Sequence, residues 1–454
     1  MTDLVEAGLL ALGFVAILLG AELWHRRSGP PVEVTRKLVH LASGLPVLFF
    51  PWIFQSTWPV LGLSGFIAGI LAWARHRGML RSVHGVERSS RGELLYPLGI
   101  VLLFWMAHDQ PVLYLVSVLV LIVSDPAAAL IGSSYGRSRY EVEEHWRSWE
   151  GSLAFFLMTF LAVHLPLVLM AGLDPSLTVL VGLVVALLVT LFEAVSLNGA
   201  DNLVIPLASY LLLQRLTAET SATVGVHLGV LLALLAGLGL LSLEFRFMKA
   251  SGVMAATLFF YVVYALAGPA WLVPPMLGTL FLVAFRSTIR NVVPLPDARY
   301  QVVAISYATL PTLALVGGLH VPALASSTGW SAPPELYAAA LAGSVAGQLA
   351  IMCATQLHPF NPSRPRHMPL GSLLALVVGS WAVVVPASLP VMDAWSVPLA
   401  ALAAGVAFVG AGAYWYGRAA TAWPSAAPWN FRLQAAAMTG AGVAAVAFGP
   451  ALAR

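Results

Sequence analysis

The chain has 454 residues, of which 59% are hydrophobic and only 9% are charged, whereas an average soluble domain carries about 25% charged residues. With a mean hydropathy of +0.86, this composition excludes a cytosolic enzyme and a disordered chain. The single cysteine, Cys353, excludes a disulfide-stabilised secreted domain because it has no partner within the chain. The net charge of +3 does not favour a nucleic-acid partner, and the composition as a whole predicts an integral membrane protein.

Apolar runs recur along the whole chain. A membrane-spanning helix needs about 20 mostly apolar residues, and on this basis we predict an all-α polytopic integral membrane protein with about 14–16 transmembrane helices. The approximate cores are residues 4–23, 38–54, 59–74, 94–108, 111–131, 151–172, 176–195, 202–214, 222–243, 250–268, 270–285, 300–319, 335–355, 369–390, 395–417 and 433–450. The first run follows Asp3 and Glu6 instead of a basic stretch, so we expect a retained helix and not a cleaved signal peptide.

The basic residues are distributed unevenly between alternate loops. If the sixteen runs cross the membrane in turn, all but two of the 23 Lys and Arg residues fall on one side, and only Arg215 and Arg454 fall on the other. Lys and Arg are enriched in cytoplasmic loops. We therefore expect the basic loops to be cytoplasmic, both termini to lie outside the cytoplasm, and the protein to reside in the plasma or inner membrane.

The acidic residues divide the chain into two parts. All but four of the 20 Asp and Glu residues lie in residues 1–243, so we predict a chemistry-bearing membrane domain over 1–243 and a second, non-catalytic membrane domain over 244–454. Ala42-Ser43-Gly44 has a counterpart in Ala250-Ser251-Gly252, and Asp125 has a counterpart in Gln348. These pairs are consistent with a degenerate tandem repeat and also with chance similarity in an Ala-, Gly- and Leu-rich sequence.

Several familiar motifs are missing. The two lysines, Lys37 and Lys249, do not belong to a P-loop, and the chain has neither the protein-kinase motifs nor an H-E-x-x-H zinc helix.

Asp125 is the first candidate. It lies in Val120-Leu-Ile-Val-Ser-Asp-Pro-Ala-Ala-Ala-Leu-Ile-Gly132, inside a predicted span, where ionisable side chains are costly and are functional candidates by default. We expect Pro126 to disturb the helix and to free backbone carbonyls. An Asp that only hydrogen-bonds a neighbouring helix is the alternative interpretation.

The second candidate is Arg147-Ser-Trp-Glu-Gly-Ser152, at the end of a predicted cytoplasmic loop. A helix N-terminus formed by Gly151 and Ser152 would offer free backbone N–H groups and a positive dipole end, which together bind phosphate. Arg139 and Arg147 add positive charge. Ser152 could instead be a simple helix cap, and we interpret Glu141, Glu143 and Glu144 as a solvated run of charge.

The third candidate is Glu193-Ala-Val-Ser-Leu-Asn-Gly-Ala-Asp-Asn202, a turn on the same predicted side. It brings the carboxylates at this face to four: Asp125, Glu150, Glu193 and Asp201. Carboxylates beside arginines suit Mg²⁺ together with a polyphosphate, because the metal bridges phosphate oxygens and the arginines neutralise the remaining charge.

These residues resemble a known family. Asp125-Pro-Ala-Ala-Ala-Leu-Ile-Gly132, Arg147-Ser-Trp-Glu-Gly-Ser152 and Asp201-Asn-Leu-Val-Ile-Pro206 are similar to motifs of the polyprenol kinases, which include dolichol, phytol and farnesol kinases and are related to phosphatidate cytidylyltransferases. Arg36-Lys37-Leu-Val-His40 and Arg91-Gly-Glu-Leu-Leu-Tyr-Pro97 also look like family features, and the resemblance covers roughly residues 30–215. This chain has Arg147 where the family usually has Lys.

The resemblance implies phosphorylation of an isoprenoid alcohol in the bilayer, with CTP as phosphoryl donor and Mg²⁺ as cofactor. In this reading Asp125 and Asp201 bind Mg²⁺, and Glu150 is a further ligand or the base that takes the hydroxyl proton. The residues assigned to the nucleotide are Arg36, Lys37, Arg139, Arg147, Gly151, Ser152 and Asn202. A phospholipid cytidylyltransferase, a multi-span transporter and a scaffold remain as alternatives.

Overall fold

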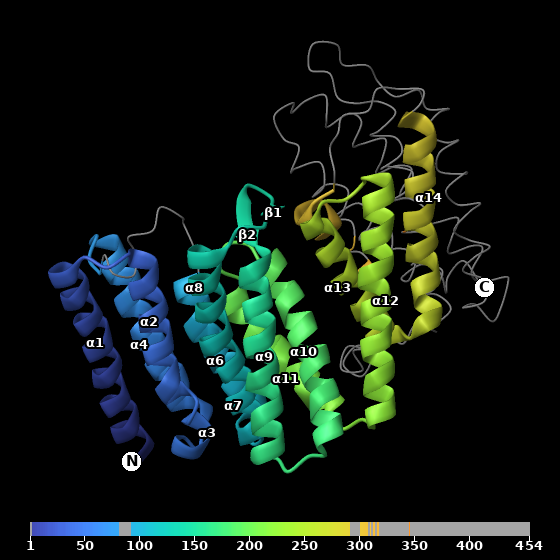
Figure 1. Ribbon diagram of the computed structural model, residues 1–454. Coiled ribbons are helices and arrows are strands. Elements are labelled where there is room, and N and C mark those ends of the chain that lie inside the picture. The colour runs from blue at the N-terminus through green and yellow to red at the C-terminus, as the bar shows by residue number, and fades with distance from the viewer. Residues whose placement is uncertain are drawn as a thin grey trace, which may run out of the picture. The chain divides into compact units, whose positions relative to one another are not determined.

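The computed structural model describes residues 2–80, 92–290 and 300–306 and the single positions 309, 312, 313, 316 and 345. These residues form two compact units, Met1–Leu232 and Ala233–Arg454, and they are almost entirely helical (Figure 1). The predicted all-α polytopic class is confirmed. The boundary between the units lies inside one helix, α12 (Ser221–Phe245), a little before residue 243 where the acidic residues thin out.

The first unit consists mainly of long helices packed side by side, as Figure 1 shows. Its helices are α1 (Thr2–Ser28), α2 (Val32–Val47), α3 (Phe50–Ile53), α4 (Thr57–His76), α6 (Gly92–Ala107), α7 (Pro111–Leu119), α8 (Asp125–Tyr135), α9 (Trp149–Leu169), α10 (Pro175–Val195) and α11 (Asp201–Leu216), followed by the first half of α12.

Eight helices among the described residues are long and apolar enough to cross a membrane. They correspond to eight of the predicted spans. Three other predicted spans, 38–54, 94–108 and 202–214, correspond to the shorter helices α2, α6 and α11, each of 16 residues. The five predicted spans from 300–319 onward lie almost wholly outside the described residues.

The helix that carries Asp125 is interrupted by a π-helical turn. Pro111–Tyr135 is continuous, but Val120–Ser124 winds as a π-helix between α7 and α8. Pro126 follows in the first turn of α8, where its missing N–H removes a helical hydrogen bond. The expected disturbance at Pro126 therefore takes the form of a π turn, a feature that is frequent at functional sites.

The centre of the first unit is α10, which packs against α9 and α11. Four of its valines, Val181, Val184, Val185 and Val189, are fully buried. The outer helix α1 is the opposite case: Leu4, Leu9 and Leu12 are each more than 60% exposed. A helix that is apolar on all sides and exposed fits a membrane span whose outer face contacts lipid.

Two glycines allow pairs of helices to cross closely beside the candidate active site that is described in the next section. A Cβ at Gly44 of α2 would lie 2.3 Å from Cγ2 of Ile122 in the π turn, and one at Gly99 of α6 would lie 2.8 Å from the carbonyl oxygen of Asn202. Larger side chains would push these helices apart. The two glycines thus set how closely α2 approaches the π turn and α6 approaches the start of α11.

The loop predicted at 132–150 contains a small antiparallel hairpin, β1 (Arg139–Val142) and β2 (His145–Ser148). A two-residue turn joins the strands, and Glu143 adopts a positive φ of 52° there. The hairpin lies at the end of the first unit where α2, α9 and α11 begin (Figure 1).

The described part of the second unit contains the end of α12, then α13 (Ala250–Ala267), the 3₁₀ turn Pro269–Leu272 and α14 (Val273–Arg290). Gly252, in the Ala-Ser-Gly sequence of α13, is again tightly packed, since a Cβ would lie 2.4 Å from the carbonyl oxygen of Tyr300.

Candidate active site

The first unit contains a cavity of about 1210 Å³. This volume exceeds the roughly 300–1,000 Å³ typical of small-molecule sites, so it can hold more than one ligand. One end is charged and is formed by Glu33, Arg36, Lys37, Arg75, Asp125, Glu144, His145, Arg147, Asp201 and Asn202. The other end is apolar and extends between α1, α2, α4 and α6.

Lys37 and Asp125 form an ion pair at the centre of the charged end. The Lys37 ammonium lies 2.7 Å from Oδ1 and 2.6 Å from Oδ2 of Asp125, and the two side chains are only 8% and 17% exposed. The π turn and the crossing at Gly44 bring α2 against the N-terminus of α8. An ammonium between both carboxylate oxygens neutralises a charge that would otherwise be costly at this depth.

Arg36 lies one residue away on the same helix and binds Glu33. Its Nη2 is 2.7 Å from Oε1 of Glu33, and its Nε is 3.2 Å from Oε2. The guanidinium also interacts electrostatically with Asp125 and Asp201. Arg36 therefore adds positive charge to the cavity wall next to the Lys37–Asp125 pair.

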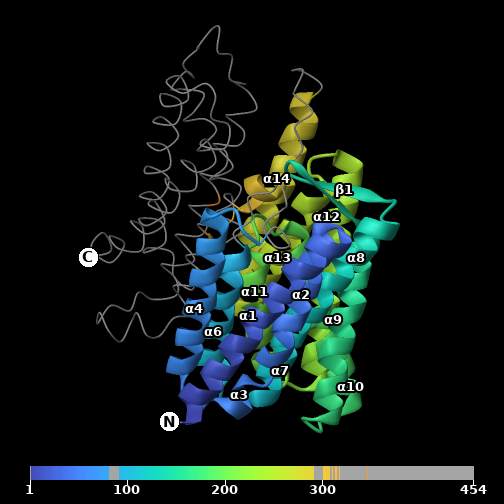
Figure 2. The same cartoon turned by 90° about the vertical axis from the view of Figure 1, so that its left-hand side faces the viewer.

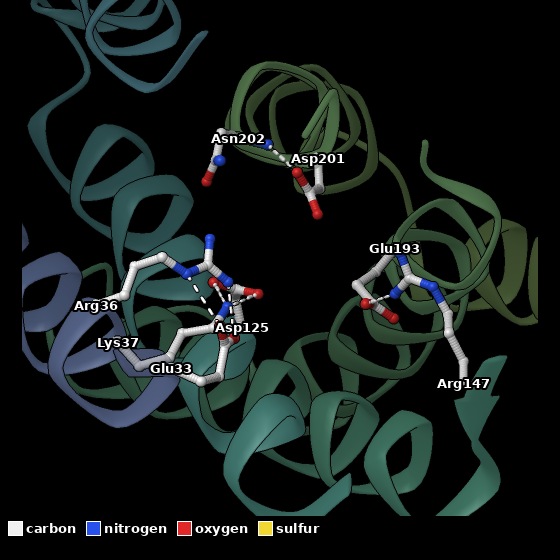
Figure 3. Close-up of polar contacts among 8 residues, drawn as sticks. All are labelled: Glu33, Arg36, Lys37, Asp125, Arg147, Glu193, Asp201 and Asn202. Atoms are coloured by element: carbon white, nitrogen blue, oxygen red, sulfur yellow. Dashed lines mark hydrogen bonds and ion pairs between the residues drawn. The ribbon is translucent and has the colours of Figure 1, made fainter. Parts of the chain in front are cut away.

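Asp201 and Asn202 begin α11 and face the same space from the other side (Figure 3). Within the described residues, the Asp201 carboxylate accepts one hydrogen bond, from the backbone N–H of Asn202 at 3.0 Å. It interacts electrostatically with Asp125, Arg147 and Lys37. Two carboxylates from distant parts of the chain thus line one cavity, as the magnesium hypothesis requires.

Arg147 comes from the hairpin and binds one group in the last turn of α10 and one just after that helix. One guanidinium nitrogen is paired with Glu193, and Nη2 donates to the carbonyl of Ser196 at 3.0 Å. Glu193 is 7% exposed, and Arg147 compensates its charge. The pair fixes the hairpin to the loop that leads to Asp201.

Gly151 and Ser152, the groups expected to bind phosphate, have hydrogen-bond partners within the protein. α9 begins at Trp149, and the Ser148 hydroxyl caps it by accepting the Gly151 N–H at 3.1 Å. The Ser152 hydroxyl lies 2.8 Å from that of Tyr140, whose pKa is raised by burial. Neither Gly151 nor Ser152 lines the cavity. Their sequence pattern reflects close packing, since a Cβ at Gly151 would lie 3.0 Å from the Ala128 carbonyl.

Glu150 and Arg139 also lie away from the cavity lining. One Glu150 oxygen accepts the backbone N–H groups of Arg137 and Ser138, at 3.1 and 3.0 Å. Glu150 therefore holds the chain between α8 and β1 in place. Arg139 is exposed on β1. We do not carry their predicted metal and nucleotide roles into the proposal below.

Asp125 and Asp201 fit a Mg²⁺ ion only if substrate phosphates and water supply its remaining ligands. No group of three His, Cys, Asp or Glu side chains that could hold a metal occurs among the described residues. Mg²⁺ commonly binds through one or two carboxylates plus substrate phosphates and water, and Asp125 and Asp201 match that smaller donor set. Because Lys37 contacts both oxygens of Asp125, it would have to release at least one of them.

The cavity contains polar residues that motif reasoning missed. His145 and Glu144 reach it from the hairpin turn, and Arg75 reaches it from α4. Asn198 and Gly199 form a turn with φ values of +56° and +80° and line the cavity next to Asp201. The Asn-Gly pair is the only sequence signal that could have indicated this loop, because it favours such a turn.

Known proteins provide an independent comparison. No protein-family model matches the chain, and no solved structure does. The chain is 36% identical over 210 residues to a phytol kinase of Synechocystis sp., and the match covers 46% of this chain and 90% of that kinase. Because nearly all of the kinase is covered at this identity, the chain belongs to the polyprenol kinase family, which includes the phytol kinases.

Proposed function

We propose that this protein is a membrane kinase that transfers the terminal phosphate of CTP to the hydroxyl of an isoprenoid alcohol at the cytoplasmic face. Family membership supports the reaction class, through a relative that is a phytol kinase. The single observation that carries the proposal is the cavity itself, in which a charged end with two carboxylates and several basic groups continues into an apolar end. In such a cavity the phosphate donor would occupy the charged end and the lipid acceptor the apolar end, with the reacting groups between them.

Positive side chains at the charged end would hold the nucleotide phosphates. Arg36 and Arg147 each keep guanidinium donors beyond those used by Glu33, Glu193 and Ser196. Lys37 is well placed to exchange Asp125 for a phosphate oxygen. Phosphoryl transfer depends mainly on positioning and on neutralising charge, and these three residues supply positive charge on two sides of the cavity.

Asp125 and Asp201 are the residues that would hold Mg²⁺. When bound, the metal would neutralise charge on the phosphates of the donor. The alcohol oxygen would form a new bond to the terminal phosphorus as the bond between that phosphorus and the bridging oxygen breaks, and CDP and the hydroxyl proton would leave. The cavity walls keep the two substrates in line, which is the larger part of the protein's task.

The test is a product analysis with purified protein in detergent. CTP labelled at the γ-phosphate, and separately at the α-phosphate, is incubated with Mg²⁺ and with geraniol, farnesol, phytol, a long polyprenol, diacylglycerol or phosphatidate. We expect γ-label in a prenyl phosphate and α-label in CDP. Equal trials with ATP, GTP and UTP identify the donor.

Two outcomes would contradict the proposal in different ways. Release of pyrophosphate, with α-label transferred to phosphatidate, would indicate a cytidylyltransferase. The absence of any transfer by folded protein would favour transport. The position of the charged groups argues against transport, since they gather at one end of the helices and transporter substrate sites usually lie near the midplane.

A further inference from the structure

Four helices surround the apolar end of the cavity. α1 contacts α2 and α4, and α4 contacts α6. The ring is completed by His40 of α2 and Tyr96 of α6, whose ring centroids are 4.8 Å apart. Figure 2 shows α1, α2, α4 and α6 together on one side of the first unit. The space inside this ring belongs to the same cavity as Asp125.

One stripe of α2 leads from the charged end to the apolar end. Arg36 and Lys37 are followed on the same face by His40, Ser43 and Val47, at helical spacing, and all of them line the cavity. The rise from Lys37 to Val47 is about 15 Å. The side chains along the stripe change from charged through weakly polar to apolar, so a bound molecule would meet the same gradient.

The end of the apolar part that lies farthest from Lys37 along α2 is closed by buried side chains. Val47, Phe50 and Leu63 are 3%, 2% and 5% exposed, and they line the cavity there. Phe50 is held by Phe54, with ring centroids 5.2 Å apart in an edge-to-face arrangement. The closed end gives the groove a definite length.

We propose that this groove is the subsite for the isoprenoid tail and that its closed end at Phe50 limits the length of tail that the protein encloses. The inference rests on the proposed function and deepens it. The alcohol's hydroxyl lies beside Asp125 and Asp201, and its tail passes His40 and Tyr96 and runs between the four helices. A tail that enters the groove leaves lipid that is equally apolar, so little affinity is gained from the transfer. Shape and length, and not hydrophobicity, decide which alcohol is used.

The first test narrows the groove part of the way down. Ser64 lines it from α4, about 16 Å of helix rise below Arg75. Ser64→Trp should lower the ratio of kcat/KM for phytol to kcat/KM for geraniol by about tenfold or more, because only the longer tail reaches this depth. The control is Gly65→Trp, at an exposed position where a Cβ would meet no atom within 4 Å. It should leave the ratio within about twofold of the wild-type value.

The second test uses wild-type protein and therefore does not depend on a variant that folds. A farnesol analogue with a diazirine at the end of its tail is irradiated with the protein, and the labelled peptides are identified. Labels in α1, α4 and α6 that an excess of phytol removes would support the subsite. Labels confined to α9 and α10, or an unchanged phytol-to-geraniol ratio in Ser64→Trp, would overturn it.

The two hypotheses fail separately. If the wild-type protein phosphorylates no alcohol, the proposed function is wrong, whereas labelling of the groove still reports on the tail subsite. If alcohols are phosphorylated but the groove is not labelled, only the subsite is wrong.

Discussion

The two units each contain a cavity among the described residues, and the cavities differ in size and charge. That of the first unit measures about 1210 Å³ and has basic and acidic groups at one end. That of the second measures about 80 Å³, and its described lining includes no Asp, Glu, Lys, Arg or His. A volume of this size is far below the roughly 300 Å³ at which small-molecule sites begin.

The units nevertheless share a packing device. Gly44 and Gly252 both stand at the end of an Ala-Ser-Gly sequence, and both allow a contact too close for any larger residue. In the first unit the contact is with the π turn that precedes Asp125, whereas in the second it is with the backbone at Tyr300. The comparison teaches that a shared small-residue motif predicts close helix packing, whereas the chemistry depends on which charged residues lie beyond the crossing.

The largest expected effect comes from the Lys37–Asp125 pair. Asp125→Asn should lower kcat/KM about 10³-fold or more, equivalent to about 4 kcal/mol, because the carboxylate charge is lost. It should also lower the thermal stability, since a buried lysine loses its partner, a change that typically costs about 3–5 kcal/mol. Activity assays and melting curves in detergent measure the two effects.

A double variant separates stability from activity. Lys37→Met combined with Asp125→Asn removes both charges and should recover much of the lost stability without restoring turnover. Full turnover by well-folded Asp125→Asn protein would show that Asp125 has only a structural role. The proposal that charged residues make the first unit the catalytic one would then be wrong.

Asp201 provides a second test of the first unit's catalytic role, because its effect on activity can be measured without a large effect on folding. Its carboxylate accepts only the adjacent backbone N–H among the described residues, so Asp201→Asn should keep the fold and lower kcat/KM about 100-fold, or about 2.7 kcal/mol. The matched control is Glu150→Gln, whose side-chain oxygen can still accept the two backbone N–H groups. A loss in Glu150→Gln as large as that in Asp201→Asn would restore Glu150 to the active site.

Two arginines of the hairpin provide the next test. Arg147→Lys should lower kcat/KM about tenfold, because one ammonium cannot bind Glu193 and the Ser196 carbonyl with the geometry of a guanidinium. Arg139→Lys, on the exposed strand, should change it by less than about twofold. Kinetics at varied CTP concentration would measure both, and equal losses would mean that only overall charge matters.

Substitutions in the second unit should cost far less than those at Asp125 or Asp201. Glu244→Ala, Asp297→Ala and Gln348→Ala should each leave turnover within about tenfold, a barrier change near 1.4 kcal/mol. Asp297 and Gln348 lie outside the described residues, and the prediction for them rests on the scarcity of acids after residue 243. Folded Gln348→Ala protein could instead lose activity as completely as Asp125→Asn. That result would contradict the proposal that only the first unit is catalytic.

Much of the fold class and part of the site followed from the sequence alone. The membrane class depends on the length and composition of apolar runs. These are local properties of the sequence, because the thickness of the bilayer sets how many apolar residues a spanning helix needs. Asp125, Arg147 and Asp201 were predicted from charge within or beside spans, and Lys37 from the family resemblance; all four line one cavity. A buried charge needs a function or a partner, so its presence is informative even without coordinates.

The tertiary structure decided which groups meet. Lys37 and Asp125 are 88 positions apart, and Arg147 and Glu193 are 46 apart, so their pairing depends on how helices cross. Motif reasoning assigned Glu150 to the metal or to proton transfer and Gly151 to the phosphates. In the structure Glu150 accepts backbone N–H groups of Arg137 and Ser138, and the Gly151 N–H donates to the Ser148 hydroxyl. Neighbouring positions on a helix point about 100° apart, and only the packing of α1, α2, α4 and α6 determines which of them face a common groove.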